Sequence, residues 1–184
     1  MTASDVSASS VLQISFSEMS RKADFIVQAT PSGRRIELRD GVPWTCLVLD
    51  VSKTIKGSPD RRPELCFLGG KTTNGTLGVT DIFIPPEGRE GVYFCYDNSR
   101  HYVSSLVGWQ QGAFLVSRDL QVGSEVLTTS DGTPVADIQV SATPNPQAAA
   151  PFAAGVIPAQ AGKTTTFVTT ARLISLIHQA LVTP

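Results

Sequence analysis

The sequence is poor in charged residues, histidine and cysteine, and it contains no long hydrophobic run. Charged residues make up 17% of its 184 residues, and the formal net charge is −1. With so little net charge, no overall electrostatic field gathers nucleic acid or an anionic membrane surface. No run approaches the ~20 apolar residues that a membrane-spanning helix needs. We therefore expect neither a nucleic-acid partner nor a transmembrane segment.

Histidine and cysteine are too sparse and too widely spaced for a structural zinc motif. The only histidines are His101 and His178, and no two of the three cysteines are closer than twenty residues. Structural zinc sites place ligands of these types in pairs about two to five residues apart. The sequence therefore predicts no protein-built metal site, and nothing in it indicates a cofactor.

The three cysteines, Cys46, Cys66 and Cys95, each lie in a predicted strand with apolar neighbours. Such surroundings favour a buried, inert thiol over a reactive one. If a turn at 58–60 joins the first two strands, Cys66 lies opposite about position 53, too far from Cys46 for a disulfide. We therefore expect three reduced thiols, or at most one bridge, and the odd number leaves at least one thiol unpaired within the chain.

The first ten residues, MTASDVSASS, are polar and lack the apolar stretch of a secretory signal peptide. They read either as the remnant of an expression tag fused to a mature sequence or as a native start. We expect residues 1–14 to be disordered or tag-derived, with the folded part of the chain beginning after them.

The segment Val42–Gly57 has the densest pattern of β-branched and apolar residues, and it alternates as a strand does. Its first half is apolar on both faces and its second half on one face only. That change is typical of a long, bent strand that crosses a small barrel. A strand is also predicted before it, over 23–29 and again over 34–39, with an interruption between these two parts. Asp40-Gly41 predicts the hairpin turn that joins this strand to Val42–Gly57.

The remaining pattern predicts a mostly β fold with a short helix in front. Ser15 and Glu18 form a capping box, which predicts a helix over 16–22. Further strands are predicted over 64–68, 81–84, 91–97, 102–107 and 111–118, followed by a hairpin over 125–140. Glycines inside strands are typical of the bends that a small barrel requires. We therefore expect residues 15–140 to form a five-stranded antiparallel barrel with a C-terminal hairpin.

The C-terminal part of the chain reads as a linker followed by a helix. Residues 141–168 are rich in proline and alanine, which predicts a linker or an irregular wrap across the surface. Within 169–184, a helix is predicted over 171–182 with an apolar stripe of Leu173, Leu176, Ile177 and Ala180. Because so short a helix is marginal alone, we expect it to dock on the barrel and close one open end.

Five short motifs follow one another along the chain in an order that matches a known family pattern. They are ADFIVQA at 23–29, TIKG at 54–57, ELCFLGG at 64–70, GVYFCYD at 91–97 and VGWQQGAF at 107–114. This pattern resembles a family of exported bacterial proteins of unknown function. Its order and spacing over 15–119 are also similar to the netrin-like (NTR) module, the OB-type barrel of tissue inhibitors of metalloproteinases. The resemblance implies an OB/NTR-like barrel and a periplasmic or secreted location.

The chain departs from the inhibitors at the residue that matters most for their mechanism. Those proteins chelate the catalytic zinc of a protease with the amine and carbonyl of an N-terminal cysteine. Here the first cysteine is Cys46, so the mechanism does not carry over. A shared barrel alone does not fix a function.

Candidate chemistry gathers in one region, around 95–111. Cys95 with His101 is the only local thiol and imidazole pair, and Ser104-Ser105 lies beside it without a nucleophile-elbow motif. The Gly-flanked Trp109 sits at a predicted strand bend, where an indole can face a ligand. The weak ligand-binding candidates are Trp109, Gln110, Gln111, Tyr102 and His101.

Three functions fit these observations. The resemblance implies an exported protein, and the sequence has no acid, base and nucleophile cluster. The leading hypothesis is therefore a non-catalytic extracytoplasmic binding or interaction module, whose partner is another protein or a small ligand. The alternatives are a protease-inhibitor-like NTR module and an enzyme with a cryptic site near Cys95, His101 and Trp109.

Overall fold

The computed structural model describes residues 11–73, 75–79, 82–97, 102–118, 125–145, 150–160 and 166–182. The strands are β1 (Phe25–Arg39), β2 (Val42–Lys56), β3 (Glu64–Leu68), β4 (Gly70–Thr72), β5 (Gly75–Leu77), β6 (Gly91–Cys95), β7 (Ala113–Arg118), β8 (Glu125–Thr129), β9 (Val135–Ile138) and β10 (Val156–Pro158). The helices are α1 (Phe16–Lys22), α2 (Thr170–Val182) and the short 3-10 helix η1 (Trp109–Gly112). The mostly β prediction with a helix near each end is confirmed.

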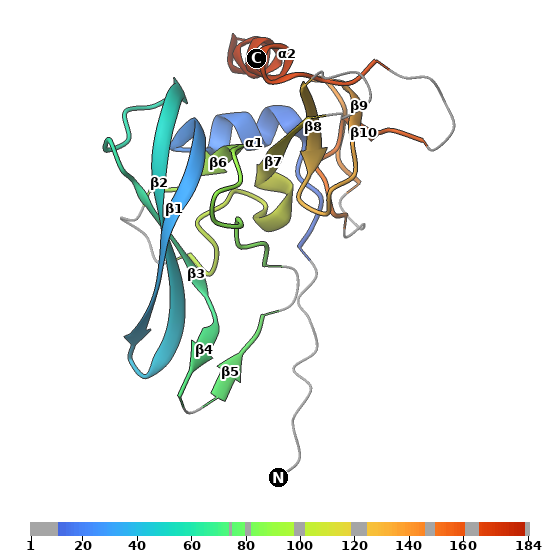
Figure 1. Cartoon of the computed structure of the whole chain (residues 1–184). Coiled ribbons are helices and arrows are strands. Elements are labelled where there is room, and N and C mark those ends of the chain that lie inside the picture. Colours follow the sequence, from blue (N-terminus) through green and yellow to red (C-terminus); the bar gives the residue numbers. More distant parts are fainter. Residues whose placement is uncertain are drawn as a thin grey trace.

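The longest elements are β1 and β2, which form a twisted antiparallel hairpin along one side of the molecule (Figure 1). Its turn is Asp40-Gly41, and both residues have positive φ angles, 51° and 79°. Those angles match the two-residue turn that the sequence predicts. The expected break between 29 and 34 is absent, because β1 continues through it with a bulge between Pro31 and Gly33.

The central sheet is antiparallel and six-stranded, in the order β3-β2-β1-β6-β7-β8. It is not closed into a barrel, so the prediction of a five-stranded barrel is wrong. Segment 102–107, expected to be a strand, makes only single bridges from Ser104 to β3 and from Leu106 to β6. The Ser105 hydroxyl hydrogen-bonds both the amide and the carbonyl of Cys66, at 2.8 and 2.9 Å. A side chain thus occupies backbone groups that a closing strand would need.

The C-terminal hairpin is also arranged differently from the prediction. β8 pairs with β7, whereas β9 pairs with β10, and only Thr128 and Pro134 bridge the two expected arms. Proline has no amide to extend that ladder. Residues 150–160, within the stretch read as a linker or wrap, supply β10 and the buried Ala153 and Ala154.

Two hydrophobic clusters flank the sheet. We call the first the helical cluster, because α1 and α2 cover it with β9 and β10. Its fully buried members are Phe16, Met19, Ile26, Val92, Phe94, Val107, Leu127, Val135, Ala153, Leu173, Ile177 and Ala180. The second, the strand cluster, lies on the opposite face of β1, β6 and β7 and adds side chains of β2 and β3. Its members are Phe25, Val27, Ala29, Leu47, Leu49, Leu65, Phe67, Tyr93, Cys95, Leu106, Ala113 and Leu115.

The predicted C-terminal helix is present and begins at Thr170. It contacts α1 and β8, and Figure 1 shows it beside α1 at one end of the molecule. Glu125 accepts the Thr170 amide at 2.6 Å, and Thr169 accepts the Arg172 amide at 3.3 Å, which satisfies two amides of the first turn. Neither α1 nor α2 has the length and apolarity that crossing a membrane requires, as far as the described residues extend.

A candidate ligand pocket beside the N-terminal helix

A cavity of about 580 Å³ opens beside α1. Its walls come from four separated parts of the chain. They are residues 11–14 with α1, Tyr96 directly after β6, segment 102–109, and Pro144. The lining residues include Leu12, Ile14, Glu18, Lys22, Tyr96, Tyr102, Ser104 and Trp109. Two of the sequence-predicted candidates, Tyr102 and Trp109, therefore line the same pocket.

One wall of the pocket is a pair of stacked tyrosines. The rings of Tyr96 and Tyr102 lie 4.1 Å apart between centroids, with 25° between their planes. Burial raises the pKa of Tyr96, so its phenol stays protonated over a wider range of pH. The stack presents a rigid aromatic surface to the cavity, and sequence reasoning missed Tyr96 because it reads as a core strand residue.

Trp109 has an unusual backbone for a large side chain. Its φ angle is +59°, directly after Gly108 at +66°. The left-handed region costs a residue with a β-carbon roughly 1–2 kcal/mol. The Trp109 amide donates to the Leu106 carbonyl at 3.1 Å, which helps to fix this turn. Strained backbone conformations are concentrated at functional sites. Here the strained turn brings the indole of Trp109 to the pocket.

Gln111 is 2% exposed, and its amide group bonds the N-terminal stretch. Its oxygen accepts the Ile14 amide and its nitrogen donates to the Leu12 carbonyl, both at 3.1 Å. Gln111 therefore holds one wall of the pocket in place instead of facing a ligand. Gln110 is half-buried and does not belong to the described lining. His101 lies outside the described residues.

Several polar groups of the pocket already have partners within the protein. Lys22 Nζ and Glu18 Oε1 form an ion pair of 2.7 Å, and hydrogen bonding to Glu18 raises the pKa of Lys22. The Ser104 hydroxyl accepts the Leu106 amide at 3.2 Å. Among the described lining residues, no nucleophile stands beside a general base. The pocket is thus mostly apolar with a charged rim.

Cys95, the thiol of the enzyme hypothesis, lies elsewhere. It is fully buried in the strand cluster and remains a free thiol. Burial raises the pKa of this thiol, which disfavours the thiolate that nucleophilic chemistry needs. Cys95 therefore behaves as a small core side chain, as the sequence predicts.

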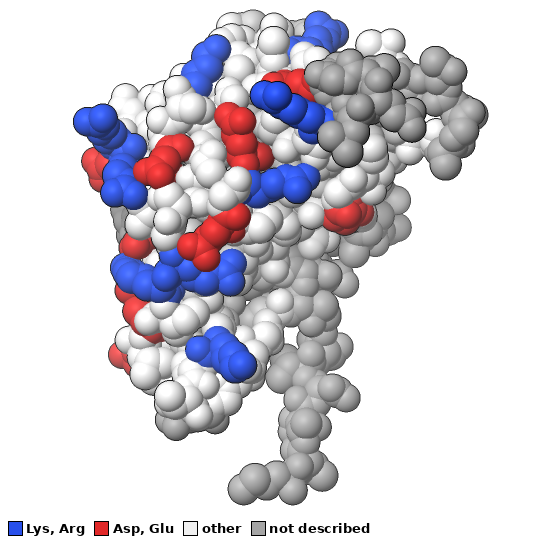
Figure 2. All heavy atoms as spheres, viewed as in Figure 1, with Lys and Arg blue, Asp and Glu red and all other residues white. Residues whose placement is uncertain are grey.

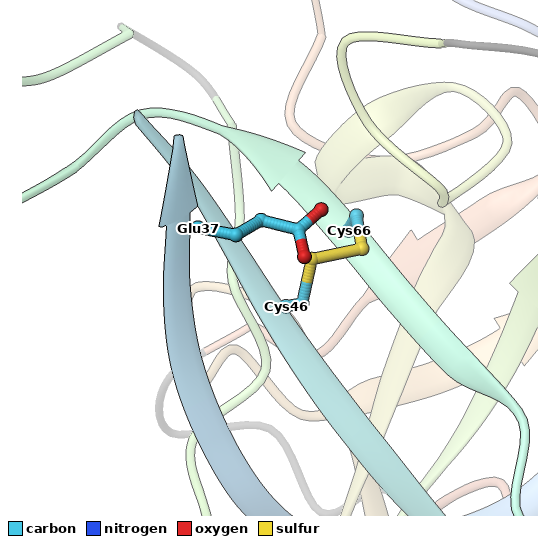
Figure 3. A group of neighbouring side chains, drawn as sticks. All are labelled: Glu37, Cys46 and Cys66. Carbon is cyan, nitrogen blue, oxygen red and sulfur yellow. A yellow bond between two sulfur atoms is a disulfide. The ribbon is translucent and has the colours of Figure 1, made fainter. Parts of the chain in front are cut away.

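Cys46 and Cys66 form a disulfide (Figure 3). Of the two predicted alternatives, three reduced thiols is therefore wrong and a single bridge is found, and the expectation that Cys66 lies too far from Cys46 is wrong as well. They face each other directly in the β2–β3 ladder, with Cα atoms 4.1 Å apart. The predicted register failed because only the first part of β2 pairs with β3. Beyond Val48, β2 continues to Lys56 on β1 alone, and the chain returns in a wide loop to Pro63.

Glu37 lies over this disulfide, and the ligand atoms of Glu37, Cys46 and Cys66 are within 4.8 Å of one another (Figure 3). Such a trio of donor types is one that zinc accepts. However, zinc binds thiolates, and here the two sulfur atoms are bonded to each other. The oxidised protein therefore does not offer this set as a metal site.

Comparison with known proteins adds no relative to this picture. No protein-family model, curated protein or solved structure matches the chain. The fold and the pocket must therefore be interpreted from their own geometry.

Proposed function

We propose that the chain is a non-catalytic binding module of an extracytoplasmic compartment, and that the aromatic pocket holds a small, flat, mainly apolar ligand. The observation that carries the proposal is the pocket itself. Its volume of about 580 Å³ falls within the range of small-molecule sites, roughly 300–1,000 Å³. A flat ring would find the Tyr102 face on one side and the indole of Trp109 nearby.

The disulfide and the charge distribution support the rest of the proposal. Disulfides persist in oxidising compartments. The resemblance to exported proteins implies a location in such a compartment. On the face shown in Figure 2, acidic and basic side chains are interspersed and form no basic stripe for nucleic acid. The paired state of Glu18 and Lys22 and the burial of Cys95 favour binding over catalysis.

A second candidate is docking of an apolar segment of another protein near the tip of the β1–β2 hairpin. Leu38 is 63% exposed there, and Ile36, Val42 and Leu77 are exposed as well. An apolar groove of about 410 Å³ runs between the hairpin and β4–β5. Exposed apolar patches of this kind mark interaction sites. The inhibitor-like alternative has less support, because the first cysteine, Cys46, is buried in a disulfide.

The test is titration of the full chain with 2-naphthol, a flat aromatic probe, followed by amide chemical shifts. We expect shifts at residues 12–14, 96 and 102–109. Tyr102→Ala should weaken binding roughly threefold to tenfold, the value of one aromatic contact. The matched control is Leu77→Ala in the hairpin groove, which should leave the affinity unchanged.

Two results would count against the small-ligand pocket. One is an unchanged affinity in Tyr102→Ala when its melting temperature matches the parent. The other is a set of shifts confined to residues 68–79, which would favour the hairpin groove instead.

A further inference from the structure

We propose that the Cys46–Cys66 disulfide is a site of thiol–disulfide exchange with a dithiol, in which Cys66 is the leaving sulfur and Arg39 stabilises its thiolate. This inference is independent of the aromatic pocket. It rests on where the disulfide lies in the sheet and on which side chains cover it.

The disulfide lies on the outer face of β2 and β3. Side chains alternate along a strand, and Leu47, Leu65 and Phe67 point into the strand cluster. Cys46 and Cys66 therefore point the other way, and they belong to neither hydrophobic cluster. Although the two residues are 0% and 3% exposed, what covers them is a layer of charged side chains and not a packed core.

That layer consists of Arg35, Glu37 and Arg39 from β1 and Glu64 from β3. Arg35 pairs with Glu64 at 2.7 Å and with Glu37 at 3.0 Å, and Arg39 pairs with Glu37. The four side chains are 28–50% exposed. Partly exposed ion pairs add little net stability, so we expect Arg35, Glu37 and Glu64 to move aside without unfolding of the sheet. A small thiol can then reach the sulfur atoms.

Arg39 makes the two sulfur atoms unequal. Its Nη2 lies 3.1 Å from Cys66 Sγ and 3.7 Å from Cys46 Sγ. The guanidinium is held over the ring of Trp44, with 4.8 Å from its central carbon to the ring centroid. A nearby cation stabilises a thiolate, and the better-stabilised thiolate leaves faster. Glu64 Oε2 also lies 3.8 Å from Cys66 Sγ, but this carboxylate is paired with Arg35 at 2.7 Å and is farther from the sulfur than Arg39. The geometry therefore selects Cys66 as the leaving sulfur and Cys46 as the sulfur under attack.

The exchange balances in two steps. A thiolate of the dithiol attacks Cys46 Sγ, the S–S bond breaks, and its electron pair goes to Cys66 Sγ beside Arg39. The second thiol of the reagent then loses its proton and attacks the reagent sulfur of the mixed disulfide. Cys46 leaves as a thiolate. The protein disulfide is reduced by two electrons, the dithiol is oxidised to its disulfide, and the two protons of the dithiol end on the protein thiols.

The experiment follows reduction of the oxidised full chain by dithiothreitol, with iodoacetamide quenching and mass spectrometry. Arg39→Gln should slow the reduction by about tenfold, because the leaving thiolate loses its cation. Arg39→Lys should restore most of the rate. Arg35→Gln is the matched control, since it belongs to the same cover but interacts with carboxylates, and its rate should stay within about twofold of the parent.

Two further readouts separate this role from a structural one. With excess 2-mercaptoethanol, a monothiol, the trapped adduct should lie on Cys46, with Cys66 alkylated. In the reduced protein, the pH at which Cys66 alkylation is half-maximal should be lower in the parent than in Arg39→Gln.

The proposal is overturned if the adduct lies on Cys66, or if Arg39→Gln reduces at the parent rate. It is also overturned if reduction proceeds only at the rate of global unfolding, measured by hydrogen exchange of β2 and β3. Equal melting temperatures of the oxidised parent, Arg39→Gln and Arg35→Gln ensure that a rate difference comes from the chemistry.

Discussion

The helical cluster and the strand cluster share one sheet but are assembled from different stretches of chain. The strand cluster uses residues between Phe25 and Leu115 only, whereas the helical cluster begins at Phe16 and ends at Ala180. The strand cluster is therefore built mainly from neighbouring strands, whereas the helical cluster needs both ends of the described chain. This difference means that a lesion near the C-terminus should damage one face of the sheet and spare the other.

The largest effect should come from Leu173→Asp combined with Ile177→Asp. Both side chains are fully buried between α2 and the sheet. An uncompensated buried charge costs roughly 3–5 kcal/mol, so the helix should leave the helical cluster. We expect a large fall in melting temperature, with hydrogen-exchange protection lost first in α1, β9 and β10.

The control is Ala171→Asp combined with Ser175→Asp, which places the same charges on the exposed face of α2. It should melt close to the parent. If amides of β2 and β3 lose protection together with α2, the two clusters form one cooperative unit and the contrast between them fails.

A middle-sized effect is expected for Gly155→Ala, which acts on the segment that leads into β10. Gly155 has a φ of +97°, and an added β-carbon would lie 2.1 Å from the Gln139 carbonyl oxygen. The left-handed backbone and the overlap together should cost roughly 2–4 kcal/mol. Gly132 has a similar φ of +88° but open space around it. Thermal unfolding of Gly132→Ala should therefore show only the stability cost of the left-handed backbone. Equal losses would show that the close contact is unimportant.

A smaller effect is expected for Lys56→Met, at the place where β2 meets α1. Lys56 Nζ donates to the carbonyls of Ser20, Arg21 and Ala23, at 2.9, 2.7 and 2.5 Å. Burial lowers the pKa of this ammonium group. Its loss removes the ammonium donor from these three carbonyls and should cost about 1–2 kcal/mol in denaturant unfolding. The exposed Lys53→Met should be neutral, and a neutral Lys56→Met would mean that water replaces the ammonium.

Local chemistry explains which elements were predictable from the sequence. Ser15 accepts the Glu18 amide at 3.1 Å and begins α1, and Asp40-Gly41 makes the first hairpin turn. The apolar stripe of α2 marks its buried face. Each of these signals depends on residues within a few positions of one another, so a single sequence contains them.

Features that depend on distant pairing were not predictable. The register between Cys46 and Cys66 depends on β3 pairing with only the first part of β2, while β1 pairs with all of it, which no local pattern shows. The Ser105 hydroxyl meets the backbone of Cys66 from 39 positions away, which no local pattern shows either. In the pocket, the Gly108-Trp109 pair was recognisable from the sequence, whereas Leu12 and Ile14 were not. Gln111 holds these two residues at the pocket from about a hundred positions away.

The contact between α1 and α2 has a consequence for how the protein is made. A ribosome releases α2 last among the described elements, so the strand cluster can form while the helical face of the sheet still has no cover. Long-range contacts of this kind slow folding, and exposed apolar surface favours aggregation in the meantime. We therefore expect chains that stop before Thr170 to be poorly soluble, because the helical face of the sheet then lacks the cover that α2 provides.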